Sequence, residues 1–371
     1  MDKNNWTYKK LGEVATLYDS QRKPVTKKDR KNGIYPYYGA SGIQDYVDNY
    51  IFDGRYLLVG EDGAKWGAND KTAFIVEGKI WVNNHAHIMT FDDSVKDRFV
   101  EYYLVGKDLN EYITGAVVPK LTQASLSKIP IHIPPLAEQE RIVAELDLLS
   151  SIIEKKKAQL KELDQLAQSI FYDMFGDPIT NEKGWEVKKL SEISLGKLSY
   201  GSGASSIPFN DDVRYIRITD INDNGELNED TVSPNVFDEK YLLNEGDILF
   251  ARSGATVGKT YCHKNKYGKC IYAGYLIRLI PNKEIVNPLY VFGYTKTSYY
   301  MEFVKKAQNA VAQPNINAKQ YGDLQICVPP LSLQQEFAEK VEAIERQKSL
   351  IQQSIVETQT LFDSRMDYWF G

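Results

Sequence analysis

Apolar residues recur at alternating steps of four and three residues over 137–175 and over 332–370. Neither stretch contains a glycine or a proline. A sustained 3.5-residue period predicts two long helices that pair along a coiled-coil seam. The seam positions predicted for the two stretches are Ile142, Leu146, Leu149, Ile153, Leu160 and Leu163, and Phe337, Val341, Ile344, Ile351 and Ile355. Lys156 and Lys348 interrupt the apolar series, and two amphipathic helices packed separately on their own domains are the alternative.

The rest of the chain has a different pattern. Short runs such as YIFDGRYLLVG, KTAFIVEGKIWVNN, VRYIRITDI, GDILFARSG and CIYAGYLIRLI are rich in apolar residues and are bounded by Gly, Asn and Asp. Such runs predict β-strands separated by turns. The chain is therefore expected to be α+β, with strand-rich regions followed by long helices.

The whole pattern occurs twice. WTYKKLGEVA, from Trp6, returns as WEVKKLSEIS, from Trp185, and IPIHIPPLAEQERI, from Ile129, returns as LQICVPPLSLQQEF, from Leu324. This predicts an internal duplication. We expect four segments: a mixed α/β domain at 1–136, a helix at 137–177, a second mixed domain at 178–331 and a second helix at 332–371.

Composition indicates an ordinary globular protein. Hydrophobic residues make up 43% and charged residues 26%, and the formal net charge is −5. The acidity falls mainly on the two predicted helices, so the mixed domains are close to neutral and can carry local basic patches. No apolar run is long enough for a transmembrane helix, and no signal peptide is recognisable. With three cysteines, the expected location is the reducing cytoplasm.

Motifs for catalysis are incomplete. SGATVGKT, from Ser253, lacks the first glycine of a phosphate-binding loop, and the residues after it predict strands instead of a helix. Asn287-Pro288-Leu289-Tyr290 resembles an adenine methyltransferase motif without its second proline and predicts a helix start instead. His85, His87, Cys262, His263 and Cys270 do not form a recognisable four-ligand metal set.

Taken in order and twice over, these motifs resemble the specificity subunit of type I restriction–modification enzymes. The resemblance rests on the Trp and Leu near the start of each repeat, on the Pro-Pro pair at the end of each mixed domain and on the helix that follows each pair. It also rests on YPYYGASG, YLLVGEDGA and WVNNHAHIM in the first domain and on GDILFARSGATVGKT and QPNINAKQY in the second. It implies two homologous target-recognition domains with pseudo-two-fold symmetry, separated by two helices that pack antiparallel.

The resemblance also implies a function. A specificity subunit has no catalytic activity, and each of its target-recognition domains reads one half of a split double-stranded DNA site. Its helices set the gap between the half-sites and dock two modification subunits, which bind S-adenosylmethionine and methylate adenine N6. Two restriction subunits, which use ATP and Mg²⁺, can join. No cofactor, metal or membrane is expected for this chain itself.

Residues that could read or hold DNA are polar, cationic or aromatic side chains beside glycine-rich turns. In the first domain they are Tyr38, Ser41, Lys65, Trp66, Asn83, Asn84, His85 and Lys120. In the second they are Arg252, Ser253, Thr256, Lys259, Gln313, Asn315 and Asn317. Two other functions stay open: a coiled-coil scaffold with protein-binding heads, and the recognition subunit of a related fused restriction enzyme.

Overall fold

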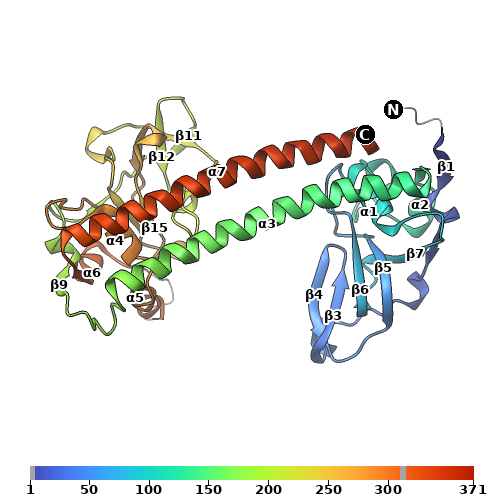
Figure 1. Ribbon diagram of the computed structural model, residues 1–371, viewed down its shortest axis with the longest axis horizontal. Helices are drawn as coiled ribbons and strands as arrows, with labels where there is room; N and C mark the ends of the chain where they lie inside the picture. Colours follow the sequence, from blue (N-terminus) through green and yellow to red (C-terminus); the bar gives the residue numbers. More distant parts are fainter. Residues whose placement is uncertain (1–4, 310–314) are drawn as a thin grey trace. The chain divides into compact units, whose positions relative to one another are not determined.

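The computed structural model describes residues 5–309 and 315–371. The chain divides into two compact units. Unit 1 comprises Met1–Lys157 and Gln353–Gly371, and unit 2 comprises Ala158–Gln352. The predicted long helices are confirmed as α3 (Leu136–Phe175) and α7 (Leu331–Phe370), shown in green and red in Figure 1. Each helix begins in one unit and ends in the other.

Unit 1 is built on a six-stranded sheet with the order β2-β7-β5-β6-β3-β4, in which only the β3–β6 pair is parallel. A separate antiparallel pair joins β1 to β8. The strands are β1 (Thr7–Lys10), β2 (Ala15–Leu17), β3 (Asn32–Gly39), β4 (Gly42–Val47), β5 (Phe52–Gly60), β6 (Ala73–Val82), β7 (Ala86–Phe91) and β8 (Pro130–Ile133). The helices are α1 (Asp97–Gly106) and α2 (Gln123–Leu126).

The sheet of unit 1 is apolar on both faces. On β5, Leu57 and Val59 join the cluster that includes α1, whereas Leu58 joins a second cluster with Ile80 and Ile88. Successive strand residues point to opposite faces, so this run of three apolar residues supplies both sides of the sheet.

Unit 2 has a four-stranded sheet with the order β10-β17-β14-β15 and three separate strand pairs, β11–β13, β12–β16 and β9–β18. The strands are β9 (Glu186–Lys189), β10 (Ser199–Tyr200), β11 (Ser206–Pro208), β12 (Val213–Ile216), β13 (Val232–Pro234), β14 (Ile248–Ala251), β15 (Thr260–Cys262), β16 (Lys269–Tyr272), β17 (Leu276–Leu279) and β18 (Gln325–Val328). The helices are α4 (Pro288–Tyr294), α5 (Ser298–Asn309) and α6 (Ala318–Gly322).

The two sequences that resemble catalytic motifs, at 253–260 and 287–290, have the predicted local structures. Residues 252–259 connect the antiparallel strands β14 and β15, so the sequence that resembles a phosphate-binding loop is a turn between strands. Asn287 caps α4 by accepting a hydrogen bond from the Leu289 backbone at 2.8 Å, and Pro288 is the first residue of that helix.

Both units share a frame that follows the sequence repeat. The Leu11 backbone donates to Ile129 and the Leu190 backbone donates to Leu324, each at 2.9 Å. After each Pro-Pro, a fully buried glutamine side chain ties the helix start to its unit. Gln139 donates to the Pro134 carbonyl at 2.8 Å and accepts from the Lys96 backbone at 2.9 Å. Gln334 donates to the Pro329 carbonyl and accepts from the Asn287 backbone, both at 2.8 Å.

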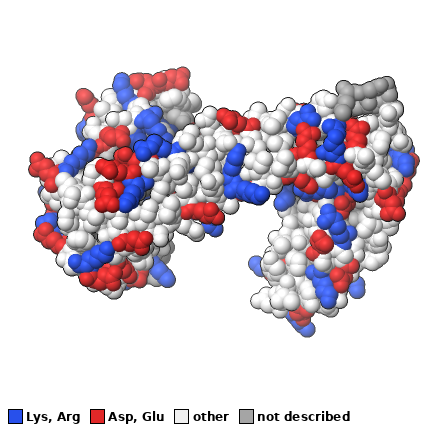
Figure 2. Space-filling model, viewed as in Figure 1, with Lys and Arg blue, Asp and Glu red and all other residues white. Residues whose placement is uncertain are grey.

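Within each unit the two long helices run antiparallel. In unit 1, Glu145 accepts a hydrogen bond from Arg365 at 3.0 Å, and further along Lys156 donates to Ser354 Oγ at 2.6 Å. In unit 2, Lys348 pairs with Asp164 at 2.8 Å, and the rings of Phe171 and Phe337 lie 5.5 Å apart. In both units the numbering falls along α7 as it rises along α3. Figure 2 shows basic and acidic side chains interspersed on the viewed face of each unit.

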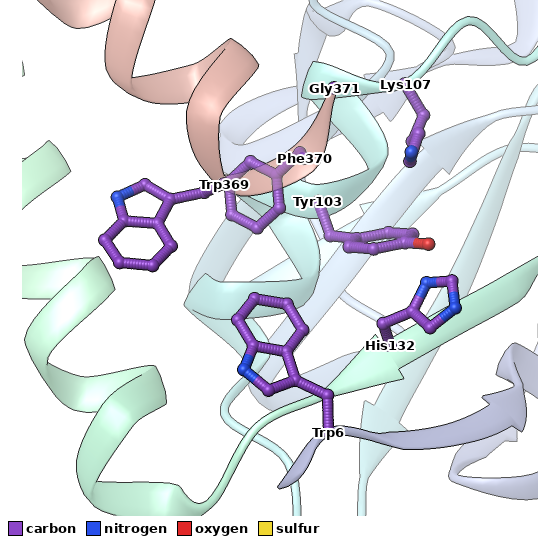
Figure 3. A pocket seen from close by; sticks show the side chains of 7 residues that line it. All are labelled: Trp6, Tyr103, Lys107, His132, Trp369, Phe370 and Gly371. Carbon is purple, nitrogen blue, oxygen red and sulfur yellow. The ribbon is translucent and has the colours of Figure 1, made fainter. Parts of the chain in front are cut away.

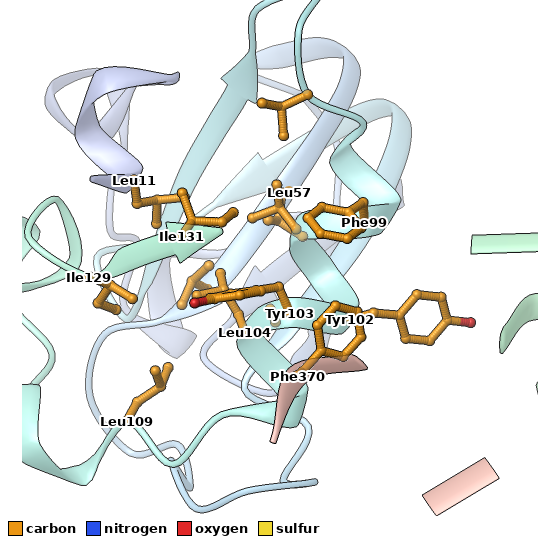
Figure 4. Close-up of a cluster of buried hydrophobic side chains, with 14 of the residues drawn as sticks. Leu11, Leu57, Phe99, Tyr102, Tyr103, Leu104, Leu109, Ile129, Ile131 and Phe370 are labelled. Atoms are coloured by element: carbon orange, nitrogen blue, oxygen red, sulfur yellow. The ribbon is translucent and has the colours of Figure 1, made fainter. Parts of the chain in front are cut away.

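The end of α7 closes the core of unit 1. Trp369 and Phe370 line a cavity of about 330 Å³ together with Trp6, Tyr103, Lys107, His132 and Gly371 (Figure 3). Phe370 belongs to the main hydrophobic cluster, where its ring lies 5.6 Å from Phe99 and 5.7 Å from Tyr103 (Figure 4). The end of α3 has the same role in unit 2, where the ring of Phe175 lies 4.7 Å from Tyr290.

Candidate nucleic-acid interface

Most of the candidates in unit 1 gather at one border of the sheet. We call this border edge 1, comprising the turns at 61–66 and 83–85 and the loop at 114–120. Asp62 and Lys120 form an isolated antiparallel bridge, and the Glu61 backbone donates to the His85 carbonyl at 2.8 Å. Backbone bonds therefore hold three turns that are distant in sequence beside one another.

A buried charge cluster lies beneath edge 1. The Glu61 carboxylate accepts from Arg22 at 2.6 Å and pairs with Lys120 at 2.8 Å. The Asp19 carboxylate lies 2.5 Å from His87 Nδ1, and His87 Nε2 lies 2.7 Å from the Leu121 carbonyl. Buried charges of opposite sign that are hydrogen-bonded to one another hold their backbone segments in one arrangement.

The same cluster contains residue types that can bind a metal ion. Asp19, Glu61 and His87 place ligand atoms within 4.8 Å of one another, so a divalent cation has three potential ligands there. Both carboxylates, however, already contact Arg22, at 3.4 Å for Asp19 and 2.6 Å for Glu61, and Lys120 adds a second cation beside Glu61. The cluster is therefore balanced by protein cations and is better suited to hold the turns than to bind a metal.

The candidates in unit 1 separate into exposed and internal side chains. Ser41, Lys65, Asn84 and His85 are exposed, and Lys120 and Tyr38 are half-buried. Lys65 pairs with no carboxylate in the described part of the chain, whereas His85 contacts Asp62. Tyr38 packs 6.0 Å from the Phe74 ring, and burial raises its pKa.

Two candidates in unit 1 have internal roles instead. Trp66 is 7% exposed, and its indole donates to the Gly60 carbonyl at 3.1 Å. Asn83 is 2% exposed, donates to Gln44 at 3.1 Å and accepts from the His85 backbone at 2.8 Å. Satisfied buried groups of this kind do not reach a ligand, so the prediction of DNA contacts does not suit these two residues.

The candidates in unit 2 gather at a second border. We call it edge 2, comprising the turn at 252–256 together with Tyr200, Tyr275 and Asn315. Arg252 follows β14, and its Nε donates to Asn315 Oδ1 at 3.3 Å. Its guanidinium lies 4.8 Å from the centre of the Tyr200 ring. Ser253 bridges to Asn315, and Thr256 donates to the Ser253 carbonyl at 3.1 Å, which tightens the turn.

Two further candidates do not join edge 2. Lys259 pairs with Asp223 at 2.9 Å and donates to the Ile221 carbonyl at 3.3 Å, so its charge is largely matched inside unit 2. Asn317 caps α6 by accepting from the Gln320 backbone at 2.9 Å, an ordinary structural role. Gln313 lies outside the described residues.

The structure also reveals exposed residues that the sequence interpretation missed. Tyr200 is 42% exposed and Tyr275 is 61% exposed, and both adjoin Arg252. On edge 1, Val117 and Val118 are 93% and 61% exposed at the tip of the loop that Thr114 and Lys120 close through two backbone hydrogen bonds. Two adjacent valines between Gly115 and Pro119 were a signal for an exposed apolar tip.

The predicted seam residues of α3 and α7 are all at least partly buried. Ile142, Leu146, Ile153, Leu163, Phe337 and Ile344 are buried, and Leu149, Leu160, Val341, Ile351 and Ile355 are half-buried.

The two lysines within the series have different partners. Lys156 donates to the Ser354 carbonyl, to Ser354 Oγ and to Thr358 Oγ1 at 2.6–3.2 Å. Lys348 instead contacts Asp164, Glu226 and Glu345 at 2.8–3.1 Å. Burial alone would lower the pKa of Lys348, but these carboxylates outweigh it and raise the pKa.

Comparison with known proteins decides the family. The family model described as the type I restriction modification DNA specificity domain matches residues 3–165 and again residues 182–359. The chain belongs to this family. The double match agrees with the internal duplication and confirms the predicted fold of two related mixed α/β domains with long helices.

Relatives agree over nearly the whole length of the chain. It is 28% identical to a putative type I restriction enzyme specificity subunit, S.HindORF215P, from Haemophilus influenzae, covering 91% of this chain and 87% of that one. It is 21% identical to the EcoDI specificity subunit from Escherichia coli, covering 92% and 81%.

Solved structures agree in fold. The S subunit of a type I restriction–modification system from M. genitalium matches with a TM-score of 0.61 at 14% identity, covering 99% of this chain and 96% of that chain. A chain from a structural study of complex assembly in the type I R-M system matches with a TM-score of 0.56 at 16% identity, covering 99% of this chain and 97% of that chain.

In the described ranges, no helix has the length and apolar character needed to cross a bilayer.

Proposed function

We propose that this chain is the DNA sequence-specificity subunit of a type I restriction–modification complex and has no catalytic activity of its own. Residues 1–136 and 178–331 each read one half of a split DNA site. The helices at 137–177 and 332–371 set the gap between the halves. The main support for this proposal is that one family domain occurs twice. Both copies have the same frame, in which a buried glutamine follows Pro-Pro, but their edges differ.

The chemistry is supplied by partners. Two modification subunits dock on the chain, bind S-adenosylmethionine and methylate adenine N6, and restriction subunits that use ATP and Mg²⁺ can join them. This assignment fits a chain whose phosphate-loop-like sequence is a turn between strands. Because the complex acts on chromosomal DNA, we place it in the cytoplasm.

DNA contacts are assigned to the exposed and half-buried groups of the two edges. On edge 1 these are Lys65, Asn84, His85 and Lys120, with Ser41 on the nearby turn after β3. On edge 2 they are Arg252, Ser253, Thr256 and Asn315. Lysines hold phosphates, and amide and guanidinium groups read base edges, so each edge combines positioning with readout.

The test is a methylome. The chain is expressed with its modification subunit in a host without DNA methylation, and modified adenines are read by single-molecule sequencing. We expect a split motif with a fixed gap that is absent when this chain is omitted. A soluble, associated complex that yields no motif would contradict the proposal and favour a scaffold with protein-binding heads.

Variants on the two edges sharpen this test. Lys65→Ala should reduce methylation through one half of the site only, and Arg252→Ala through the other half only. Equal effects of both variants on both halves would contradict the assignment of one half-site to each domain. DNA binding by the assembled complex should weaken steeply with added salt, because phosphate contacts release counterions.

A further inference from the structure

The side chain of Arg252 differs from the other arginines of residues 178–331. Arg217 and Arg278 bind carboxylates at 2.7 and 2.6 Å, and Arg214 is 8% exposed and donates to the Asn228 carbonyl. Arg252 pairs with no carboxylate among residues 5–309 and 315–371 and is half-buried at the border of the sheet. Its charge is therefore available to a ligand outside the protein.

Two neighbours fix the orientation of this guanidinium. Tyr200 lies beneath it at 4.8 Å, and Asn315 Oδ1 accepts from its Nε at 3.3 Å. Arginine stacks well on aromatic rings, and its planar group loses little freedom once one hydrogen bond is made. This bond uses Nε, and neither terminal nitrogen pairs with a carboxylate in the described ranges, so both remain available as donors.

The neighbours are themselves held. Tyr200 lies on β10 opposite Ile277, and its hydroxyl accepts from the Ala318 backbone at 3.1 Å. The Arg252 backbone donates to the Tyr275 carbonyl at 3.0 Å, and its carbonyl accepts from the Ile316 backbone at 2.8 Å. Three segments therefore converge to present one rigid donor pair.

The turn that follows Arg252 permits close approach at one residue. Gly254 has a φ of +68°, and a Cβ added there would meet no atom within 4 Å. The turn thus carries no side chain at Gly254, two residues after Arg252, and the space there is open. A flat ligand edge can approach the backbone there, as in other glycine turns at ligand sites.

From this geometry we infer that Arg252, held by Tyr200 and Asn315, reads a guanine in the half-site recognised by residues 178–331. Two terminal guanidinium nitrogens match the O6 and N7 acceptors of guanine in the major groove. Arginine also binds phosphate with two nitrogens, but a phosphate contact carries no sequence information, whereas a guanidinium plane held in one orientation can distinguish the acceptor pair of guanine from the edges of the other bases. The inference rests on the proposed function and names one base of its target.

The decisive variant is Arg252→Lys, which keeps the charge and removes the planar donor pair. The complex with each variant is compared by methylome with the wild-type complex. For Arg252→Lys and Arg252→Ala, we expect methylation of sites with another base at one G·C position to rise on the order of 10- to 100-fold relative to the cognate site. The gap and the other half-site should stay unchanged.

Variants of the neighbours test the positioning role. Tyr200→Ala and Asn315→Ala should relax the same position by a smaller factor, and Tyr200→Phe, which keeps the ring and loses only the hydroxyl bond to the Ala318 backbone, should have a weaker effect than Tyr200→Ala. All three side chains lie at the surface, and co-purification with the modification subunit verifies that each variant is folded.

Each outcome has one interpretation. Relaxation at a single G·C position in one half-site supports the inference. Uniformly weaker methylation with an unchanged motif in Arg252→Ala, together with wild-type methylation in Arg252→Lys, would show a phosphate contact and overturn the inference. Relaxation at an A·T position, or no change in either variant, would also overturn it. If the wild-type complex yields no split motif, the proposed function fails, and the guanine assignment fails with it.

Discussion

Units 1 and 2 share their frame and differ at their edges. In both, a buried glutamine follows Pro-Pro and makes the same two bonds, and a phenylalanine at the far end of a long helix completes the core. The edges have little in common. Edge 1 rests on a buried cluster of opposite charges, whereas edge 2 presents an arginine held by an aromatic ring and an amide.

This contrast shows how a duplicated domain can acquire a second specificity. The bonds of the frame lie where the two sequence repeats agree, and they leave the edge residues free to differ. On edge 1, Lys120 is matched by Glu61 and Asp62, whereas Lys65 on edge 1 and Arg252 on edge 2 pair with no carboxylate among the described residues. Equivalent substitutions in the frames of units 1 and 2 should therefore destabilise the protein by similar amounts. Substitutions outside the frame should have different effects in the two units.

The largest effect is expected at the terminal phenylalanines. Phe370→Ala and Phe175→Ala each remove a ring that is at most 3% exposed, at a cost of about 3–5 kcal/mol in the free energy of unfolding. Urea unfolding of the purified chain measures it. Leu361→Ala and Leu166→Ala, at 50% and 46% exposure on the same helices, are matched controls with small expected effects. A large loss for only one phenylalanine would break the equivalence of the units.

The buried glutamines should come next. Gln139→Met and Gln334→Met keep the side-chain volume but leave buried backbone groups without partners, which costs about 2–3 kcal/mol each. Thermal unfolding should show similar losses for the two variants. Gln352 is exposed on α7, so Gln352→Met is the control substitution. An unchanged stability in Gln139→Met or Gln334→Met would contradict the role of that residue in the shared frame.

The two lysines within the helix pairs should separate the units. Lys348→Met leaves Asp164, Glu226 and Glu345 without their shared cation and should cost about 2 kcal/mol, an effect that shrinks in high salt. Lys156→Met removes bonds to neutral oxygens only and should change stability by about 0.5 kcal/mol or less. Chemical denaturation at low and high salt measures both, and equal losses would contradict the distinction.

The last effect depends on pH and concerns a buried histidine of unit 2. His263 is 1% exposed, and burial lowers its pKa to about 4 from 6.5. Because the unfolded chain takes up this proton below about pH 6.5 and the folded chain does not, stability falls as the pH falls from 7 to 5, by about 1–2 kcal/mol. His263→Gln should lose that part of the pH dependence in unfolding experiments at both pH values. An identical pH dependence in variant and wild type would contradict it.

The sequence was sufficient for features that depend on local pattern. Heptad spacing predicted α3 and α7 to within a residue, and the Asn-Pro pair predicted the start of α4. The repeat predicted two related domains. Hairpin and turn positions such as 252–259 followed from glycine and alternating apolar residues.

The edges could be predicted only in part because their contacts join distant segments. Glu61 meets Arg22 and Lys120, and Arg252 meets Tyr200 and Asn315, pairs that no local spacing relates. Trp66 and Asn83 are predicted as DNA contacts because polar and aromatic side chains beside glycine-rich turns can reach a ligand, but in the structure both side chains are buried and bonded inside unit 1. Residue type alone does not show which way a side chain at a turn points.

Unit 1 is discontinuous in the chain, and this has a consequence for biosynthesis. Its core needs Phe370, Trp369 and Met366, which are translated only after all of unit 2. Until then Phe99 and Tyr103 lack their final packing partner, so the nascent unit 1 carries an unfinished apolar surface. Unit 2 is continuous and can mature first. Contacts this distant in sequence close slowly, so the first domain to be synthesised should be the last to become protease-resistant.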